Sequence, residues 1–380
     1  MVKSSRASHT GISGSITVLH VIESFLAGSL YSVRNLTNML AAHSTRQVIL
    51  HAIRNNTPVD YADQFDPRVE LIHWPAAIRE ISPASDLEAT REFWAALSRV
   101  EPHVVHCYSA KAGFICRMAT PLNVPVLYSP HGFPFQGAFS RTAAAYYGLE
   151  FIAGLLPGRI TLASGQSESR AARRVLHRVV TLPNIVELDR FLALDPPLHP
   201  DNGIRPRIVT TGLLREHKNP RLFADIARAM EGADFIWIGG AVDDYQFNPV
   251  PKNMRITGWK SRDEIAGALS RADIFLQTSI GEGMSNSLLE AMAAGLPCIV
   301  TNVPGNRDLV RSDTGNLFGE NAEGFRNHLV RLLNSPDERF RLGNRNRDWI
   351  IANYDNEANM HRYFQLYQSL AQGRGIPRHL

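Results

Sequence analysis

Short runs of β-branched and aromatic residues alternate with longer segments of helical spacing along almost the whole chain. Each short run has the length of a strand, and the segments between them are long enough for crossover helices. This alternation is typical of parallel sheets built from βαβ units. In the first half we expect strands at 16–22, 48–52, 69–72, 104–107, 124–129 and 160–163, with helices at 32–42 and 87–100.

A proline-rich break divides this pattern in two. Residues 194–207 contain four prolines and a glycine, which interrupt every periodicity and indicate a linker. A helical segment at 356–370 follows the last strand of the second half. We therefore expect two domains, 1–194 and 195–355, and a C-terminal segment, 356–380, that packs on the first domain. The strands expected in the second half are 208–211, 235–238, 254–257, 274–277 and 298–301.

The size and apolar content of the chain fit this division. Of 380 residues, 44% are hydrophobic, which is enough for two separate cores. Open parallel sheets bind ligands outside the carboxyl ends of their strands. We therefore expect an α/β protein with two Rossmann-like, doubly wound parallel-sheet domains that face each other across a cleft lined by strand-to-helix loops.

The net charge and the apolar pattern of the chain limit the kinds of partner and the cellular location that we expect. The net charge of +4 suits a phosphate ligand, an anionic membrane surface or nucleic acid, but the absence of a nucleic-acid-binding motif argues against the last. The most apolar stretch, 143–156, contains Glu150 and is too short to span a bilayer. The first fifteen residues lack the apolar core of a signal peptide, so we expect a cytoplasmic protein. The cysteines, which have no metal-like spacing, are expected to be buried thiols: Cys107, Cys116 and Cys298.

The stretch 272–300 reads as strand, glycine-flanked loop, helix, tight turn and strand. Gly281 and Gly283 permit close backbone approach, and the free amides at the following helix start suit a diphosphate. Glu282 and Glu290 flank that site, and a carboxylate can accept hydrogen bonds from vicinal hydroxyls. On spacing alone another interpretation stays open, in which Glu290 is a solvated helix residue and Glu282 a charge favoured by the helix dipole.

The loop after the first strand of the second half carries Gly212, Arg215 and Lys218. Two cations at a strand end suit the negative charge that builds on a departing diphosphate, where preorganised electrostatics lowers a barrier most. Lys218 and Arg215 are therefore candidate catalytic residues. The alternative, two exposed charges at the start of a helix, stays open.

The pattern around the two glutamates closely resembles the E-x7-E segment of the retaining GT-B glycosyltransferases of family 4. The resemblance covers 16–372, is strongest over 207–317, and implies retention of anomeric configuration without a bound metal. It implies that Glu282 lies beside the transferred sugar and that Glu290 binds the nucleotide ribose. Backbone amides facing the sugar and phosphates are implied at Met284, Ser285 and Asn286. The residues in register with the family segment are Ser279, Glu282, Gly283, Leu289, Glu290, Ala291, Met292, Ala293, Gly295 and Pro297.

The cation loop matches the same family in part. Lys218 stands at the family position after Gly212, whereas Leu213 occupies the place of the family's arginine. Arg215 is the candidate substitute for that arginine.

The base-binding side is implied by two further segments. The run that ends in Gly239 and Gly240 resembles the family's strand-end glycine loop. Ile256 and Gly258 are implied to flank the base. Trp259 is either a stacking partner of the base or an ordinary core aromatic.

The first half carries one histidine with an implied role. Ser129-Pro130-His131-Gly132 ends an expected strand, where a lone histidine is most often structural. Family members have a His-Gly pair at this strand end, so His131 is implied to contact a sugar hydroxyl or the transition state. Gly28 retains one of the two glycines that family members often have near the diphosphate.

The acceptor side rests on resemblance alone. His106, Ser109 and Lys111 resemble the family's H-x-H-S-x-K-A-G segment, with Tyr108 in place of the second histidine.

A basic helix is expected at 167–178, where Arg170, Arg173, Arg174 and Arg178 fall on neighbouring turns. Such a helix either lies on anionic lipid, which would place the protein at the inner face of a membrane, or is an ordinary solvated face.

The resemblance, taken with these features, implies a retaining, metal-independent hexosyltransferase of cell-surface polysaccharide biosynthesis. Its donor would be a nucleotide-diphosphate sugar, UDP- or GDP-linked, which is a substrate and not a cofactor. Its acceptor would be lipid-linked or an oligosaccharide. No Asp-x-Asp stands beside the proposed diphosphate loop, and Asp243-Asp244 lies in a surface-like segment, so no metal site is expected. Two alternatives stay open: a noncatalytic nucleotide-sugar-binding scaffold subunit and a GT-B-fold epimerase.

Overall fold

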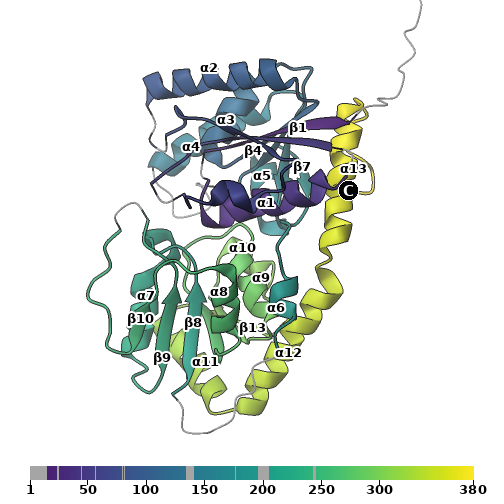
Figure 1. Ribbon diagram of the computed structural model, residues 1–380. Coiled ribbons are helices and arrows are strands. Elements are labelled where there is room, and N and C mark those ends of the chain that lie inside the picture. The colour runs from purple at the N-terminus through teal and green to yellow at the C-terminus, as the bar shows by residue number, and fades with distance from the viewer. Residues whose placement is uncertain are drawn as a thin grey trace, which may run out of the picture.

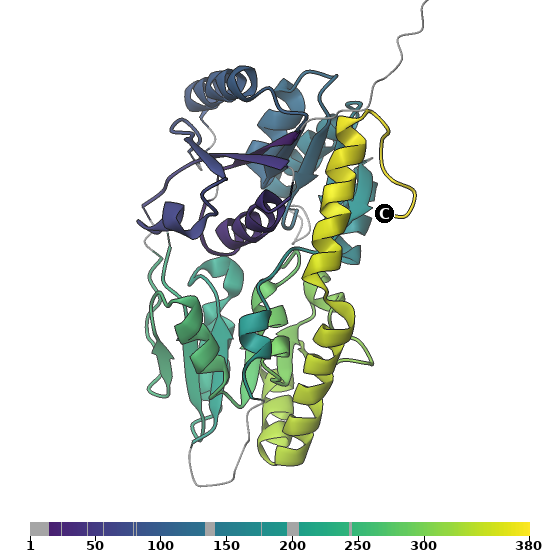
Figure 2. The same cartoon turned by 45° about the vertical axis from the view of Figure 1, so that its right-hand side comes forward.

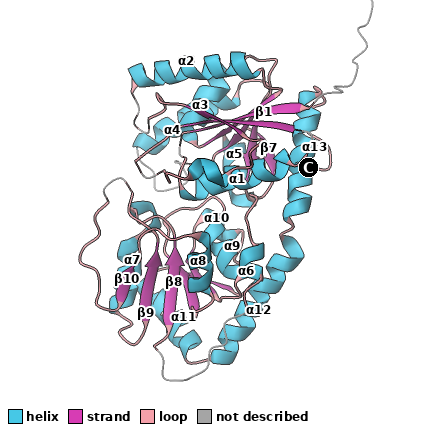
Figure 3. Ribbon diagram, viewed as in Figure 1, coloured by secondary structure: helices cyan, strands magenta, loops and turns pink. Residues whose placement is uncertain are grey.

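The computed structural model describes residues 15–380 except 24, 44, 56, 79, 81, 134–140, 176, 196–204 and 243–244. The polar N-terminal segment, most of the expected linker and the Asp243-Asp244 pair therefore lie outside the described residues. The described chain forms two lobes, one above the other in Figure 1. Strands and helices alternate through both lobes, as the colouring of Figure 3 shows.

The first lobe is built on a seven-stranded sheet of order β3-β2-β1-β4-β5-β6-β7, in which every pairing is parallel. The edge strand β7 was not expected, because its short run begins with an exposed arginine and has a single buried position. The strands are β1 (Ile16–Ile22), β2 (Thr45–His51), β3 (Glu70–His73), β4 (Val104–Tyr108), β5 (Val126–Ser129), β6 (Arg159–Ala163) and β7 (Arg178–Thr181).

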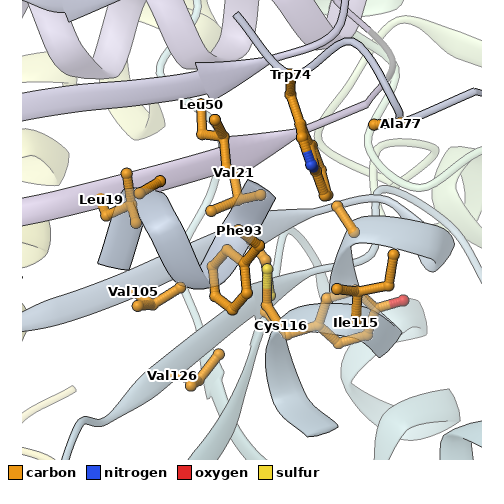
Figure 4. Close-up of a cluster of buried hydrophobic side chains, with 14 of the residues drawn as sticks. Leu19, Val21, Leu50, Trp74, Ala77, Phe93, Val105, Ile115, Cys116 and Val126 are labelled. Carbon is orange, nitrogen blue, oxygen red and sulfur yellow. The ribbon is translucent and has the colours of Figure 1, made fainter. Parts of the chain in front are cut away.

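Helices cover both faces of this sheet. On one face, α2, α3 and α5 pack over the apolar cluster drawn in Figure 4, which includes Trp74, Phe93 and Cys116. Helix α4 lies beside α3, and α1 covers the other face through Leu36 and Leu40. The elements are α1 (Ala27–Ala41), η1 (Tyr61–Gln64), α2 (Pro83–Val100), α3 (Ala110–Ala119), α4 (Arg141–Gly154) and α5 (Gln166–Arg174).

The basic helix expected at 167–178 is shorter than predicted. Helix α5 ends at Arg174, and Arg178 begins β7. His177, between them, turns into the lobe, where its Nε2 lies 2.9 Å from the carbonyl oxygen of Glu150 and its Nδ1 lies 2.6 Å from Thr161 Oγ1. These long-range contacts override the helical pattern, so the prediction of one continuous helix through Arg178 is wrong.

The second lobe is built on a six-stranded parallel sheet of order β10-β9-β8-β11-β12-β13. Its edge strand β13 was also missed, because Asn and Gly bracket only two apolar residues there. The strands are β8 (Arg207–Thr211), β9 (Asp234–Ile238), β10 (Met254–Ile256), β11 (Ile274–Gln277), β12 (Cys298–Thr301) and β13 (Asn316–Gly319). The helices before and around this sheet are α6 (Asp189–Leu192), η3 (Glu216–Lys218), α7 (Pro220–Arg228), α8 (Arg262–Leu269), α9 (Asn286–Ala293), α10 (Pro304–Arg307), α11 (Ala322–Leu333) and α12 (Pro336–Asn353).

The last helix returns to the first lobe. After α12, Asp355 caps α13 (Asn356–Ala371) by accepting a hydrogen bond from the amide of Ala358. Figure 2 shows α13 running from the lower lobe along the side of the upper one. Its residues Tyr363, Leu366 and Tyr367 are buried in the same cluster as Val18 and Leu127 of the first sheet, as expected for a helix that crosses back.

These observations confirm the expected fold class of two facing Rossmann-like parallel sheets. None of the described helices is long and apolar enough to cross a membrane. Within the described ranges, no group of three or more His, Cys, Asp or Glu side chains could hold a metal ion. The three cysteines are buried free thiols.

Candidate active site

A cleft lies between the two lobes, at the carboxyl ends of their strands. The first lobe contributes α1 and the loop after β5, and the second contributes the loops after β8, β9 and β11. This is where open parallel sheets bind ligands. The cleft is lined by the following residues singled out in the sequence: Gly28, His131, Gly212, Arg215, Lys218, Gly239, Glu282, Gly283, Met284, Ser285, Asn286 and Glu290.

The two residues expected to flank the base are not among the cleft-lining residues. Ile256 lines a different groove between β9, β10 and α8. Gly258 has φ +73° and bridges to Gly239. Trp259 does line the cleft and is 50% exposed. Because it is half-exposed and lines the cleft, Trp259 is not a core aromatic. Its indole packs so closely on Gly240 that a Cβ added to Gly240 would lie 2.3 Å from Nε1.

Lys218 and Glu282 form an ion pair within the cleft, with Nζ 2.6 Å from Oε1. The two loops that carry them are joined by Thr278, whose hydroxyl donates to the carbonyls of Lys218 and Asn219. Burial alone would raise the pKa of Glu282, but the charge and hydrogen bond of Lys218 bring that pKa below its usual value. Lys218 is therefore not an exposed charge at the start of a helix, which was the alternative interpretation. When a bond breaks heterolytically, a positive and a negative charge develop. A carboxylate and an ammonium held side by side can stabilise the two charges.

The start of α9 presents backbone amides to the cleft. Ser285 caps the helix by accepting a hydrogen bond from the amide of Leu288, and Gln277 Nε2 holds the Ser285 hydroxyl at 2.7 Å. Asn286 Nδ2 donates to Ser32 Oγ of α1 at 3.3 Å, so the helix start also contacts the first lobe. Free amides and the helix dipole make this position suited to an anion.

The loop of Gly283 touches the first lobe directly. A Cβ on Gly283 would lie 2.9 Å from the carbonyl carbon of His131 and 3.0 Å from the amide nitrogen of Gly132. Only glycine fits this approach. On the first-lobe side, the Gly132 amide donates to Glu168 Oε1 at 2.6 Å, and the same carboxyl accepts from Ser164. Glu168 thus orients the strand-end turn that meets the loop of Gly283, and no local sequence signal identifies Glu168.

His131 is a partly buried residue with a left-handed backbone, φ +53°. Its ring is stacked on Tyr108, with centroids 5.8 Å apart and an angle of 11° between the planes. Burial lowers the pKa of His131 to about 4, so the ring is neutral at physiological pH. Its Nε2 makes no hydrogen bond to any described residue. A neutral, desolvated imidazole with a free nitrogen can exchange a hydrogen bond with a sugar hydroxyl.

Glu290 is held by an arginine that the sequence interpretation missed. Arg262 Nη2 lies 2.8 Å from Glu290 Oε1, and both side chains are largely buried. Burial raises the pKa of Glu290, although Arg262 opposes the shift. The guanidinium also lies over the rings of Tyr31 from α1 and Phe191, 5.3 and 5.1 Å from their centroids. Glu290 is therefore not a solvated helix residue.

The three residues expected on the acceptor side, His106, Ser109 and Lys111, are not among the residues that line the cleft. His106 is buried, with Nδ1 2.7 Å from the Tyr367 hydroxyl of α13 and Nε2 2.9 Å from Ser129 Oγ. Lys111 pairs with Asp86 at 2.6 Å on the α2 side. Ser109 has φ +67° and donates to the buried carboxyl of Glu23. These side chains make structural contacts between elements of the first lobe and, through His106, with α13.

Comparison with known proteins agrees with this arrangement. Residues 205–335 match the family model described as glycosyl transferases group 1, and residues 27–188 match the glycosyl transferase 4-like domain. A relative from Escherichia coli, UDP-Gal:alpha-D-GlcNAc-diphosphoundecaprenol alpha-1,3-galactosyltransferase, is 27% identical over 301 residues, which cover 71% of this chain and 76% of the relative.

Solved structures share the fold. Sucrose-phosphate synthase from Thermosynechococcus elongatus superposes with a TM-score of 0.79 at 17% identity, covering 93% of this chain and 99% of that one. Anabaena HepE in complex with UDP-glucose gives a TM-score of 0.74 at 13% identity, covering 93% and 100%.

Two facing parallel sheets with a cleft at their carboxyl ends define a protein of the GT-B class. The chain belongs to the group 1 glycosyltransferases, family 4, and is a glycosyltransferase.

Proposed function

We propose that the protein is a retaining hexosyltransferase that takes its sugar from a UDP-hexose and transfers it to a sugar carried on a lipid diphosphate. The name of the Escherichia coli relative specifies a UDP-sugar donor and a polyprenyl-diphosphate acceptor. A Rhizobium meliloti relative, 24% identical over 207 residues, is named for lipopolysaccharide core biosynthesis. Both names support a role in the assembly of surface polysaccharide.

The observation that carries the proposal is the Lys218–Glu282 ion pair beside the start of α9. We place the donor diphosphate at the α9 amides, where Lys218 and Arg215 line the same cleft. These cations and amides offset the charge that develops on the leaving diphosphate, which is why we propose a reaction without a divalent ion.

In the proposed reaction, the bond between the anomeric carbon and the diphosphate oxygen breaks first, and both electrons leave with the phosphate. The sugar then has oxocarbenium character, which the carboxylate of Glu282 stabilises. The acceptor hydroxyl attacks from the face that the phosphate leaves, and its proton passes to the phosphate oxygen. Retention therefore needs no covalent sugar–enzyme intermediate of the glycosidase kind.

Glu290 and His131 hold the two ends of the donor in this proposal. Glu290 accepts the ribose hydroxyls, and Arg262 stays beside it to keep the carboxyl charged. His131, neutral at working pH, contacts a hydroxyl of the hexose and does not relay a proton. We propose Trp259 as the stacking partner of the base, because it lines the cleft and is 50% exposed.

A donor and acceptor panel tests this proposal. The purified protein would be incubated with UDP-, GDP- and ADP-hexoses and with polyprenyl-diphosphate sugars or oligosaccharides, and the products identified by mass spectrometry. We expect one new glycoside from a UDP-hexose. A free or isomerised sugar would instead identify an epimerase, and donor binding without any product would identify a scaffold subunit. Failure to bind any nucleotide sugar would overturn the proposal.

A further inference from the structure

The first turn of α5, in the first lobe, is capped by a side chain of the second lobe. The N-cap residue of α5 is Gly165, which has no side chain to accept hydrogen bonds from the helix amides. Instead, the carboxylate of Asp308, just after α10, accepts from the amide of Ser167 at 2.9 Å and from its hydroxyl at 2.7 Å. Free amides and the helix dipole favour a carboxylate at this position. One residue of the second lobe thus completes a helix of the first.

Gly165 leaves the room that this contact needs. A Cβ added to Gly165 would overlap with Oδ2 of Asp308, and its three nearest heavy atoms would all belong to Asp308. The backbone of Gly165 is extended, with φ −158° and ψ 176°, and any residue can adopt that conformation. The requirement for glycine therefore comes from the approach of the carboxylate and not from the backbone.

On the first-lobe side, the capped turn leads directly to the cleft. Glu168 follows Ser167 in this turn, and its carboxyl holds the amide of Gly132, the neighbour of His131. The position of α5 therefore determines where the turn that carries His131 lies.

On the second-lobe side, α10 packs against the loop of Glu282. The Gly305 amide donates to the carbonyl of Glu282 at 3.2 Å. A Cβ on Gly305 would overlap with the carbonyl oxygen of Gly283, so the start of α10 lies directly on this loop. Helix α10 ends at Arg307, and Asp308 follows at once. The contact between α10 and α5 therefore joins the two walls of the cleft.

We propose that Asp308 is a positioning residue, which holds His131 opposite Glu282 by capping α5 from the second lobe. Neither Asp308 nor Ser167 is among the described residues that line the cleft, so their contact acts through the turn and the loop that it joins. Without the cap the two walls can shift, and a small misplacement of reacting groups lowers a rate strongly. The proposal rests on the roles proposed above for His131 and Glu282, whereas the contact between the lobes does not depend on those roles.

A reciprocal pair of variants tests the proposal by kinetics. Asp308→Ala should lower kcat by about tenfold and leave Kd for UDP unchanged. Gly165→Ala should lower kcat similarly, because the added Cβ displaces the carboxylate. In the Asp308→Ala background, Gly165→Ala should have no further effect, because the overlap is gone. A further loss in that background, normal kcat in Asp308→Ala, or a parallel loss of UDP affinity would each overturn the proposal.

Two further variants provide the control and the rescue. Asp313→Ala removes an exposed carboxylate of the same lobe, which pairs with Arg311, and should keep normal kcat. Asp308→Asn keeps one acceptor oxygen for the Ser167 amide and should recover part of the lost rate. An equal loss of kcat in Asp313→Ala would mean that the effect is not specific to the cap.

The distance between the lobes gives a readout that needs no turnover. Spin labels would be attached through Met118→Cys on α3 and Arg326→Cys on α11, both at exposed positions, while the native cysteines are buried. Electron–electron double resonance should show a narrow distance distribution, which Asp308→Ala broadens. Identical distributions would contradict the proposal. Failure of the proposed reaction would leave this result as predicted, so the two failures are distinguishable.

Discussion

The two lobes position their cleft residues by different kinds of contact. In the second lobe, Lys218 and Glu282 follow the neighbouring strands β8 and β11, and Ser285 is fixed by bonds to residues three and eight positions away. In the first lobe, His131 depends on the ring of Tyr108, and the adjacent Gly132 depends on Glu168, which is 36 residues distant. The second-lobe side of the cleft is therefore largely encoded in short motifs, whereas the first-lobe side depends on tertiary packing.

The largest effect should come from the second lobe's ion pair. Lys218→Ala removes the cation beside the proposed leaving diphosphate and leaves Glu282 buried without its partner. We expect kcat to fall by about 10² to 10³, as for loss of one preorganised electrostatic contact. Steady-state kinetics would measure the change. Lys252→Ala, at an exposed lysine outside the cleft, is the control and should keep normal kcat. Equal kcat values for the two variants would show that Lys218 takes no part in the reaction.

The next effect concerns donor affinity. Glu290→Gln keeps the shape of the side chain but removes the charge that Arg262 meets and the ribose would use. Loss of a charge-assisted hydrogen bond corresponds to about 1.5–3 kcal/mol, so UDP should bind roughly tenfold to a hundredfold more weakly. Isothermal titration would give Kd, with Glu231→Gln at an exposed position as the control. Unaltered UDP affinity would mean that the ribose binds elsewhere.

A smaller effect should follow from the first lobe's positioning residue. Glu168→Ala removes the acceptor of the Gly132 amide next to His131. We expect kcat to fall by about tenfold through misplacement of the turn, with Kd for UDP unchanged, and Glu168→Gln to recover part of the loss. A general loss of folding would lower donor binding as well, and partial recovery by glutamine together with normal Kd would distinguish the two. Full activity of Glu168→Ala would show that the turn does not need this contact.

The smallest effect is the pH response of His131. Burial lowers its pKa in the folded protein to about 4, below the ordinary 6.5, so folding favours the neutral ring. Its contribution to stability is complete above about pH 6.5 and is lost as the pH falls from there towards 4. The ratio of kcat for the original protein to that for His131→Asn should therefore stay within about twofold between about pH 8 and 6. A ratio that changes with an apparent pKa near 6.5 would contradict the neutral role.

Sequence patterns were sufficient for the two sheets except for one edge strand of each, β7 and β13. Strands such as β1 and β11 are buried at every position and mostly apolar, whereas β7 and β13 are partly exposed and partly polar. The break after α5 also escaped prediction, because the burial of His177 depends on Glu150 from another helix.

In the candidate site, too, residues within one motif could be predicted, whereas residues that act through contacts between elements could not. Residues within one motif, such as Glu282 and Glu290, could be selected from the family segment that they resemble, and the structure brings them to one cleft. Arg262 and Glu168 could not, because their roles arise from contacts with Glu290 and Gly132 on other elements. Ile256 was selected from its segment alone, yet it lines a different groove. The catalytic roles, like the domain boundary at 194 and 195, stay predictions.

The stereochemistry of transfer tests the central claim most directly. An α-linked UDP-hexose would be supplied with the lipid-diphosphate acceptor, and the anomeric proton of the first product examined by NMR. We predict an α-glycoside, because the acceptor enters on the face that the phosphate leaves, between Glu282 and the α9 amides. A β-glycoside as the initial product would contradict the account.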